Sequence, residues 1–126
     1  MSVFVPMKKA EAAMMYNNTL DCYLSCQITQ TNKLTASMEA DGFKGTTTRI
    51  GVELYVEKRV LGVIWKRIDI GYTDNVWVDS TTHFTYSNTF STFLNSSGVY
   101  RTTVTFTVSG TGGADDVIVK TSTVTY

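Results

Sequence analysis

Strict alternation of apolar and polar residues is the feature of this chain that most constrains its fold. In the stretch SSGVYRTTVTFTVSGTGG, residues 96–113, one set of positions is apolar: Tyr100, Val104, Phe106 and Val108. The positions between them are polar: Arg101, Thr103, Thr105 and Thr107. Successive side chains of a β-strand point to opposite faces of the sheet, so a period of two indicates a half-buried strand. The pattern predicts that threonine covers a solvated sheet face and that the apolar residues fill a core.

The same period recurs along most of the chain. It predicts strands at residues 20–28, 34–40, 48–58, 63–70, 76–78, 82–90, 100–108 and 117–126. The chain contains 21 threonines and only 17% charged residues, which favours strands because β-branched side chains suit a pleated surface. No segment after residue 18 has the period of a helix. The sequence predicts an all-β fold, an immunoglobulin-like antiparallel β-sandwich of about seven to eight strands, and the alternative is a closed barrel or jelly roll.

The length of 126 residues, 43% of them hydrophobic, fits one domain. We expect residues 1–18 to form an irregular leader or N-terminal arm outside the core, and residues 19–126 to form a single β-sandwich domain. The leader ends in a small-x-small pattern at Ala10-Glu11-Ala12, which is read either as the remnant of a truncated signal peptide or as a frayed leader. No apolar run approaches the roughly 20 residues of a membrane-spanning helix. With 11 basic and 11 acidic residues, the charge balance argues against a nucleic-acid partner.

Two resemblances rest on short motifs in the middle and C-terminal parts of the chain. The segment SSGVYRTTVTFTV resembles the Gly-x-Tyr start of strand F in immunoglobulin-like domains, which implies that the Tyr100 hydroxyl closes a tyrosine corner. The position two residues further on holds Thr102, where antibody-type domains carry a cysteine, so the inter-sheet disulfide of those domains is absent. The segments VELYVEKRVLGVIWKRI, GVYRTTVTFTV and STVTY together resemble small secreted proteins of Gram-positive bacteria of uncharacterised function. That resemblance implies a secreted or cell-surface protein and supplies no activity.

The two cysteines and the single histidine give little support to catalysis. Cys22 and Cys26 fall on one face of a predicted strand, about 13 Å apart at about 3.3 Å per residue, which is too far for a disulfide within the chain. We expect both to be buried free thiols or to be linked between chains. A nucleophile needs a nearby base, usually histidine, and His83 lies on a predicted polar face. We therefore expect no enzyme.

Several acidic residues are candidate calcium ligands or catalytic pairs. Asp115 and Asp116 follow a glycine turn, and Asp74 and Asp79 occupy another long loop, but neither spacing matches an EF-hand. Side chains that hydrogen bond the backbone of their own turn explain the same residues. Glu53 and Glu57 project from one strand face, a pattern typical of a solvated surface. We expect no metal site and no cofactor.

Aromatic residues in the middle of the chain are the remaining candidate binding residues. They are Trp65, Trp77, Tyr55 and Tyr72. Exposed rings on a flat sheet stack on sugars or anchor a protein partner. We expect Trp65 to be half inside the core and Trp77 to be more exposed. The sequence favours a non-catalytic extracellular interaction module with a protein or glycan partner. The alternatives are a carbohydrate-binding module and a structural subunit, a possible homo-oligomer, that assembles through its N-terminal arm.

Overall fold

A computed structural model describes residues 16–126 and consists of strands joined by short turns. The predicted leader and signal remnant lie mostly outside the described residues. The strands are β2 (Thr19–Thr29), β3 (Lys33–Gly42), β4 (Thr47–Val60), β5 (Ile64–Arg67), β6 (Trp77–Thr81), β7 (Thr85–Phe93), β8 (Val99–Gly110) and β9 (Gly113–Thr125). A 3-10 turn, Thr73–Asn75, lies in the loop before β6. In the part of the chain that the structure describes, no helix has the length and apolar character needed to cross a membrane.

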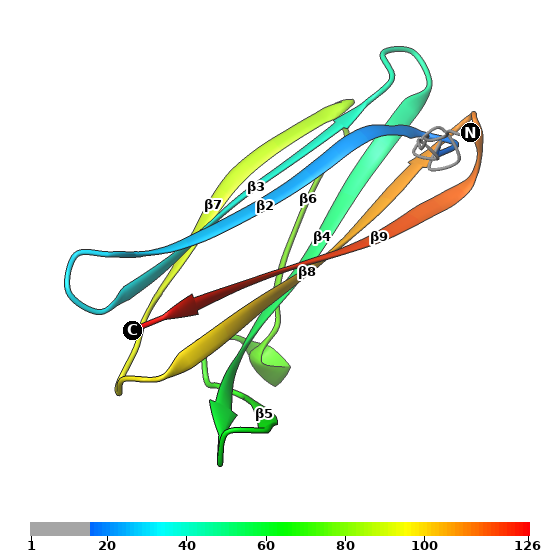
Figure 1. Cartoon of the computed structure of the whole chain (residues 1–126). Coiled ribbons are helices and arrows are strands. Elements are labelled where there is room, and N and C mark those ends of the chain that lie inside the picture. The colour runs from blue at the N-terminus through cyan, green and yellow to red at the C-terminus, as the bar shows by residue number, and fades with distance from the viewer. Residues whose placement is uncertain (1–15) are drawn as a thin grey trace, which may run out of the picture.

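The strands form two antiparallel sheets that face each other (Figure 1). The smaller sheet has the order β2-β3-β7, and the larger has the order β5-β4-β8-β9, with β6 also paired to β4. β6 and β5 follow one another along the same edge of β4, since β6 pairs with Ile50–Leu54 and β5 with Glu57–Val60. The three-stranded order corresponds to strands A-B-E and the four-stranded path to C′-C-F-G of an immunoglobulin-like sandwich. The prediction of a β-sandwich is confirmed.

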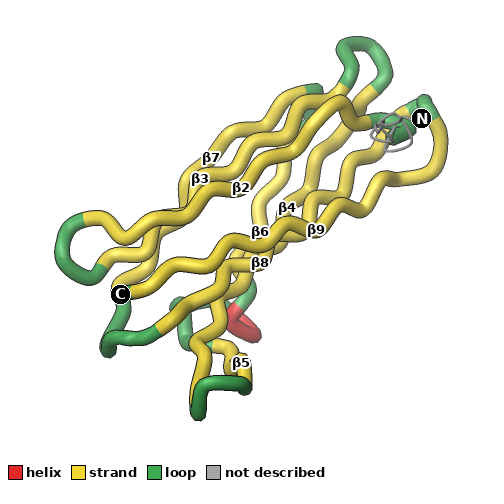
Figure 2. Tube along the Cα trace, in the orientation of Figure 1, coloured by secondary structure: helices red, strands yellow, loops and turns green. Residues whose placement is uncertain are grey.

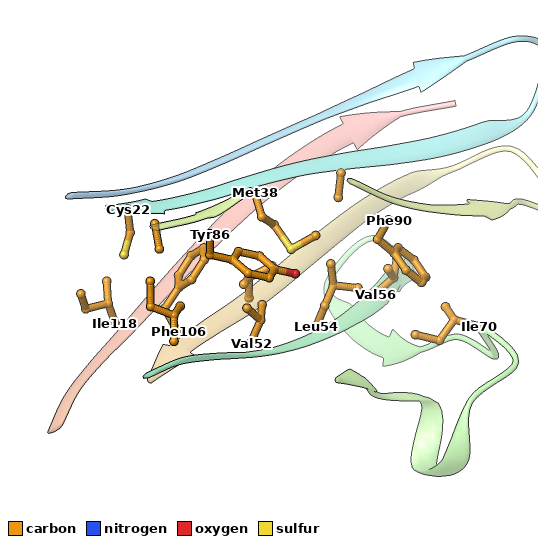
Figure 3. Packing of buried hydrophobic residues seen from close by; sticks show 14 of the residues in the cluster. Cys22, Met38, Val52, Leu54, Val56, Ile70, Tyr86, Phe90, Phe106 and Ile118 are labelled. Atoms are coloured by element: carbon orange, nitrogen blue, oxygen red, sulfur yellow. The ribbon is translucent and has the colours of Figure 1, made fainter. Parts of the chain in front are cut away.

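The core fills the space between the sheets (Figure 3). β3 contributes alternate residues such as Leu34 and Met38, and the middle of the larger sheet contributes Leu54 and Phe106. Apolar residues at every second position of both inner faces become fully buried in this way, as the period of two predicts. Tyr86 and Phe90, both on β7, place aromatic rings across the gap between the sheets.

Tyr100 forms the tyrosine corner that the resemblance to immunoglobulin-like domains implies. Its ring is 2% exposed at the start of β8, and its hydroxyl donates a 2.6 Å hydrogen bond to the backbone carbonyl of Ser96. The backbone of Gly98, just before β8, also exchanges two hydrogen bonds with Tyr126 at the C-terminus. The corner thus fixes the entry of β8 and the end of β9 together.

Two side-chain orientations differ from the alternating pattern. Leu20 was expected in the core with Cys22, but it is exposed because the pairing of β2 with β3 shifts register between Thr19 and Asp21. The shift places Thr19 inside and turns the leucine outward. Thr103 was expected on the solvated face and is instead buried, since it lies in the middle of the larger sheet between Tyr55 and Thr121 of the adjacent strands.

The two cysteines form no disulfide with each other; Cys22 is buried, as expected, whereas Cys26 is half-buried. Cys22 is buried against Ile118 and neighbouring core residues, and burial raises the pKa of its thiol to about 12. Burial also raises the pKa of Cys26, while the hydroxyls of Thr102 and Ser122 beside it act in the opposite direction. Both thiols therefore stay protonated near neutral pH and behave as small apolar side chains.

Asp116 ties the N-terminal end of β2 to β9. Its carboxylate is buried and accepts hydrogen bonds from the backbone amides of Asn17 (3.0 Å) and Asn18 (2.8 Å) and from the hydroxyl of Thr19 (2.6 Å). The Asn18 side chain is also buried and accepts a hydrogen bond from the amide of Gly112. Asn17 and Asn18, which the sequence assigned to the leader, are thus hydrogen bonded to the domain.

Candidate functional site

The outer face of the larger sheet, turned away from the core, carries a group of stacked aromatic and arginine side chains. Its members, which we call the Arg–aromatic patch, are Tyr55, Glu57, Trp65, Arg67 and Arg101. They come from three adjacent strands: β4, β5 and β8. Tyr55 and Trp65 are half-buried, so part of each ring remains available to a ligand.

Arg101 is the centre of the patch. Its guanidinium carbon lies 4.3 Å from the centroid of the Trp65 ring, which is a cation–π contact. Two of its nitrogens, Nη2 and Nε, donate to the same Glu57 oxygen at 2.7 and 3.1 Å. Register explains this meeting, since Arg101 lies directly opposite Glu57 in the β4–β8 pair. The ion pair fixes the guanidinium, so that Arg101 is held in one orientation against the tryptophan.

Arg67 makes a second stack on the same face. Its guanidinium carbon lies 3.8 Å from the centroid of the Tyr55 ring. Arg67 is opposite Glu57 in the β4–β5 pair, so Tyr55 lies on the diagonal position two residues along β4. The patch holds two arginines and one glutamate, and it therefore combines a net positive charge with two aromatic rings.

A tight hairpin between β4 and β5 positions Trp65. Leu61 and Gly62 have φ angles of 54° and 74°, and the amide of Val63 donates to the carbonyl of Val60 at 3.2 Å. Two successive central residues with positive φ match the right-handed twist of the flanking strands, and the chain reverses within a few residues. Trp65 consequently lies opposite Arg59 on the same face as Glu57.

Threonine and valine side chains surround the patch on the same outer face. Thr105 and Thr121 lie on β8 and β9, and the exposed residues Val78, Val117 and Val119 flank them. Short β-branched side chains do not hide the aromatic rings, and they leave the face open. The arrangement can bind a partner surface but brings no nucleophile and base together.

The other two predicted binding residues are not part of this face. Trp77 was expected to be the more exposed tryptophan, but it lies opposite the core residue Leu54 and packs on Phe90 with ring centroids 5.5 Å apart. Tyr72 remains exposed and also contacts Phe90, at 6.3 Å between centroids. The structure therefore brings Trp65 and Tyr55 together and places Trp77 and Tyr72 at the edge of the core, around Phe90.

The outer face of the smaller sheet offers a second, polar depression. It is a shallow groove of about 380 Å³ whose lining includes Tyr23, Ser25, Ser37, Glu39, Asn88 and Thr89. The ring of Tyr23 is exposed, and its hydroxyl donates to Asp21 at 2.6 Å, which raises the pKa of the tyrosine. Tyr23 was not among the predicted binding residues, although its position among the polar residues of an alternating strand marks it as outward-facing.

The candidates for catalysis and metal binding stay apart. His83 is exposed, as predicted. Asp79 accepts hydrogen bonds from the Tyr86 hydroxyl (2.8 Å) and the Asn88 amide (2.9 Å), and the bond from Tyr86 lowers the pKa of the carboxyl. Within residues 16–126, no three His, Cys, Asp or Glu side chains gather in a way that could hold a metal ion.

No protein-family model matches this sequence, and a comparison with curated proteins finds no match. The function is accordingly inferred from the geometry of the two sheet faces.

Proposed function

We propose that this protein is a non-catalytic extracellular interaction module that binds a protein partner through the outer face of its larger sheet. The observation that carries the proposal is the Arg–aromatic patch, in which Arg101 is held at once by Trp65 (4.3 Å) and Glu57 (2.7 Å). Tryptophan, tyrosine and arginine are the residue types that contribute most to binding free energy at protein interfaces. The location outside the cell follows the resemblance to secreted proteins.

Pre-organisation supports a binding role for these side chains. An arginine that is already stacked and ion-paired loses less rotamer freedom when a partner docks than a free arginine would. Glu57 and Arg101 are also only partly exposed, so their attraction is less screened than that of a surface pair. Exposed threonine and valine side chains around the patch could contact a partner surface that extends beyond it. The net positive charge of the patch favours an acidic partner.

Affinity enrichment with matched variants tests the proposal. Immobilised wild-type protein is compared with Trp65→Ala/Arg101→Ala and with Tyr23→Ala, which removes an exposed aromatic residue from the opposite face. We expect a protein that is retained by the wild type and by Tyr23→Ala and is lost with the double variant. Loss of a large hot-spot side chain reduces affinity by about thirtyfold or more. Equal retention by all three proteins would contradict the proposal.

A carbohydrate-binding module is the second candidate, and the groove on the smaller sheet favours it. The groove joins an exposed ring, Tyr23, to hydroxyl, amide and carboxylate groups, which is the combination that recognises a sugar. A glycan array distinguishes the two functions. Binding that is lost in Tyr23→Ala and kept in Trp65→Ala/Arg101→Ala would assign the function to the groove. Assembly through the N-terminal arm involves residues outside the described part of the chain.

A further inference from the structure

The β4–β5 hairpin projects from one end of the sandwich. β8 pairs with β4 only as far as Lys58. Beyond Lys58, β5 is the strand that pairs with β4 among the described residues. Arg59 to Trp65 therefore continue beyond the end of β8. Figures 1 and 2 show this hairpin extending away from the two sheets. The turn at its end is accessible from several sides.

The end of the hairpin is apolar although it faces water. Leu61, Val63 and Ile64 are 88%, 77% and 51% exposed. Leu61 also adopts a φ of 54°, a conformation that glycine, asparagine and aspartate accept far more readily than leucine. Folding does not explain a leucine at this position, since it costs backbone strain and contributes nothing to the core. We call Leu61, Val63 and Ile64 the apolar tip.

Basic residues surround the apolar tip. The segment KRVLGVIWKR, Lys58–Arg67, contains two lysines, two arginines and no acidic residue, whereas the whole chain has a formal net charge of zero. Lys58 lies directly opposite Lys66 in the hairpin. The Lys58 ammonium is engaged by the sandwich, since it donates to the Ser96 hydroxyl at 2.5 Å and lies 5.8 Å from the centroid of the Tyr100 ring. Arg59 and Lys66 are exposed beside the apolar tip, and an anionic surface would attract them.

We propose that the apolar tip inserts into the interface of an anionic lipid bilayer. Leu61, Val63 and Ile64 would enter the boundary between headgroups and acyl chains, and the basic residues would contact the lipid phosphates. Trp65 follows directly, and tryptophan prefers this interfacial depth. The hairpin extends two to three residues from Trp65 to the turn, a length of about 7–10 Å. Interfacial segments are buried to a similar depth, about 5–10 Å into the boundary between headgroups and acyl chains.

The backbone of the hairpin tolerates such a position. Val60 pairs with Ile64, and Val63 donates to Val60, so the strands and the turn supply one another with hydrogen bonds. The combination of groups favours lipid over protein, since lysine is depleted at protein interfaces, whereas lysine beside apolar residues and tryptophan is typical of membrane-surface segments. The inference goes beyond the proposed interaction function, because it assigns a lipid ligand to the apolar tip, which lies outside the Arg–aromatic patch; Trp65 and Arg67 belong to both the patch and the hairpin.

Vesicle co-sedimentation with the full chain tests the inference. The two probes are vesicles of phosphatidylcholine alone and vesicles with about one third phosphatidylglycerol, an anionic lipid. We expect binding to the anionic vesicles and at least tenfold weaker binding to the neutral ones. Raising the salt from about 0.1 M to about 1 M, which shortens the Debye length from about 10 Å to about 3 Å, should release the protein. No binding of the wild type to anionic vesicles would overturn the inference.

Matched variants assign the binding to the tip. Leu61→Ser/Val63→Ser should reduce partitioning at least tenfold, whereas Val117→Ser/Val119→Ser, which removes two comparably exposed apolar residues from β9, should change it less than twofold. Arg59→Gln/Lys66→Gln should weaken binding to anionic vesicles, and Lys44→Gln/Arg49→Gln, exposed basic residues away from the hairpin, should not. Equal effects of the tip and β9 variants would contradict the inference. Circular dichroism checks that each variant is folded.

Discussion

Replacing Asp116 with asparagine should destabilise the domain by about 2–4 kcal/mol, because this buried carboxylate accepts three hydrogen bonds. Two come from the amides of Asn17 and Asn18 and one from the hydroxyl of Thr19, at 2.6–3.0 Å. Hydrogen bonds to a charged group contribute about 1.5–3 kcal/mol each. Asparagine retains one carbonyl oxygen, and its NH₂ group would face a donor where the second oxygen was, so one or two of these bonds are lost and a buried donor is left unpaired.

Chemical and thermal unfolding measure the effect, with Asp115→Asn as the matched control. Asp115 is the adjacent residue, carries the same charge and is exposed, so its substitution should change stability by less than about 0.5 kcal/mol. At about 3–5 °C per kcal/mol for a domain of this size, a loss of about 2–4 kcal/mol in Asp116→Asn should lower Tm by about 6–20 °C. Equal Tm values for the two variants would refute the role of Asp116. Calcium that raises the Tm of the wild type but not of Asp116→Asn would show that the carboxylate is a metal ligand instead.

Three further predictions follow from the core and the corner. Tyr100→Phe should cost about 1–2 kcal/mol in urea unfolding, because it removes the 2.6 Å bond to Ser96, and an unchanged midpoint would contradict the corner. Trp77→Ala should cost about 2–3 kcal/mol and Trp65→Ala less than about 1 kcal/mol, since only Trp77 packs against the core; the reverse order would contradict their placement. The Cys22 thiol should resist iodoacetamide in the native protein at pH 8. Burial raises the pKa of Cys22 from 9.0 to about 12, so the stability that the protonated thiol contributes is present below pH 9 and is lost as the pH rises towards 12. Between pH 9 and 12 the free energy of unfolding of Cys22→Ala should therefore fall less than that of the wild type.

The strands and the core could be predicted from sequence because they depend on local periodicity. Alternation identifies Leu34, Leu54 and Phe106 as core residues wherever a strand is polar on its other face. The tyrosine corner is also local, since Tyr100 and Ser96 are four residues apart. Leu20 does not follow the alternation, because β2 shifts register against β3 between Thr19 and Asp21 and the side chain turns outward. Such a shift depends on the partner strand and leaves no mark in β2 alone.

The candidate site could be predicted only in part. Trp65 and Tyr55 were identified as aromatic residues on strands, but their contacts with Arg101 and Arg67 arise from cross-strand register. Arg101 is separated from Glu57 by 44 positions in the chain, and no local pattern specifies that they are opposed. Trp65 is half-buried, as expected, but it packs against arginines of the outer face and not against the core. Trp77, expected to be more exposed, packs against the core. Trp77 lies on the core side of the larger sheet because it pairs with the core residue Leu54 of the adjacent strand.

Site-specific photo-crosslinking tests the central claim, that the larger sheet binds the partner, most directly. A photoreactive residue is placed at Thr121, an exposed position beside the patch, or at Ser37, an exposed position in the groove of the smaller sheet. Each protein is irradiated with its enriched partner present. A discrete adduct from position 121 that disappears with Trp65→Ala/Arg101→Ala, together with no adduct from position 37, is the predicted result. An adduct from position 37 that is insensitive to those substitutions would contradict the assignment.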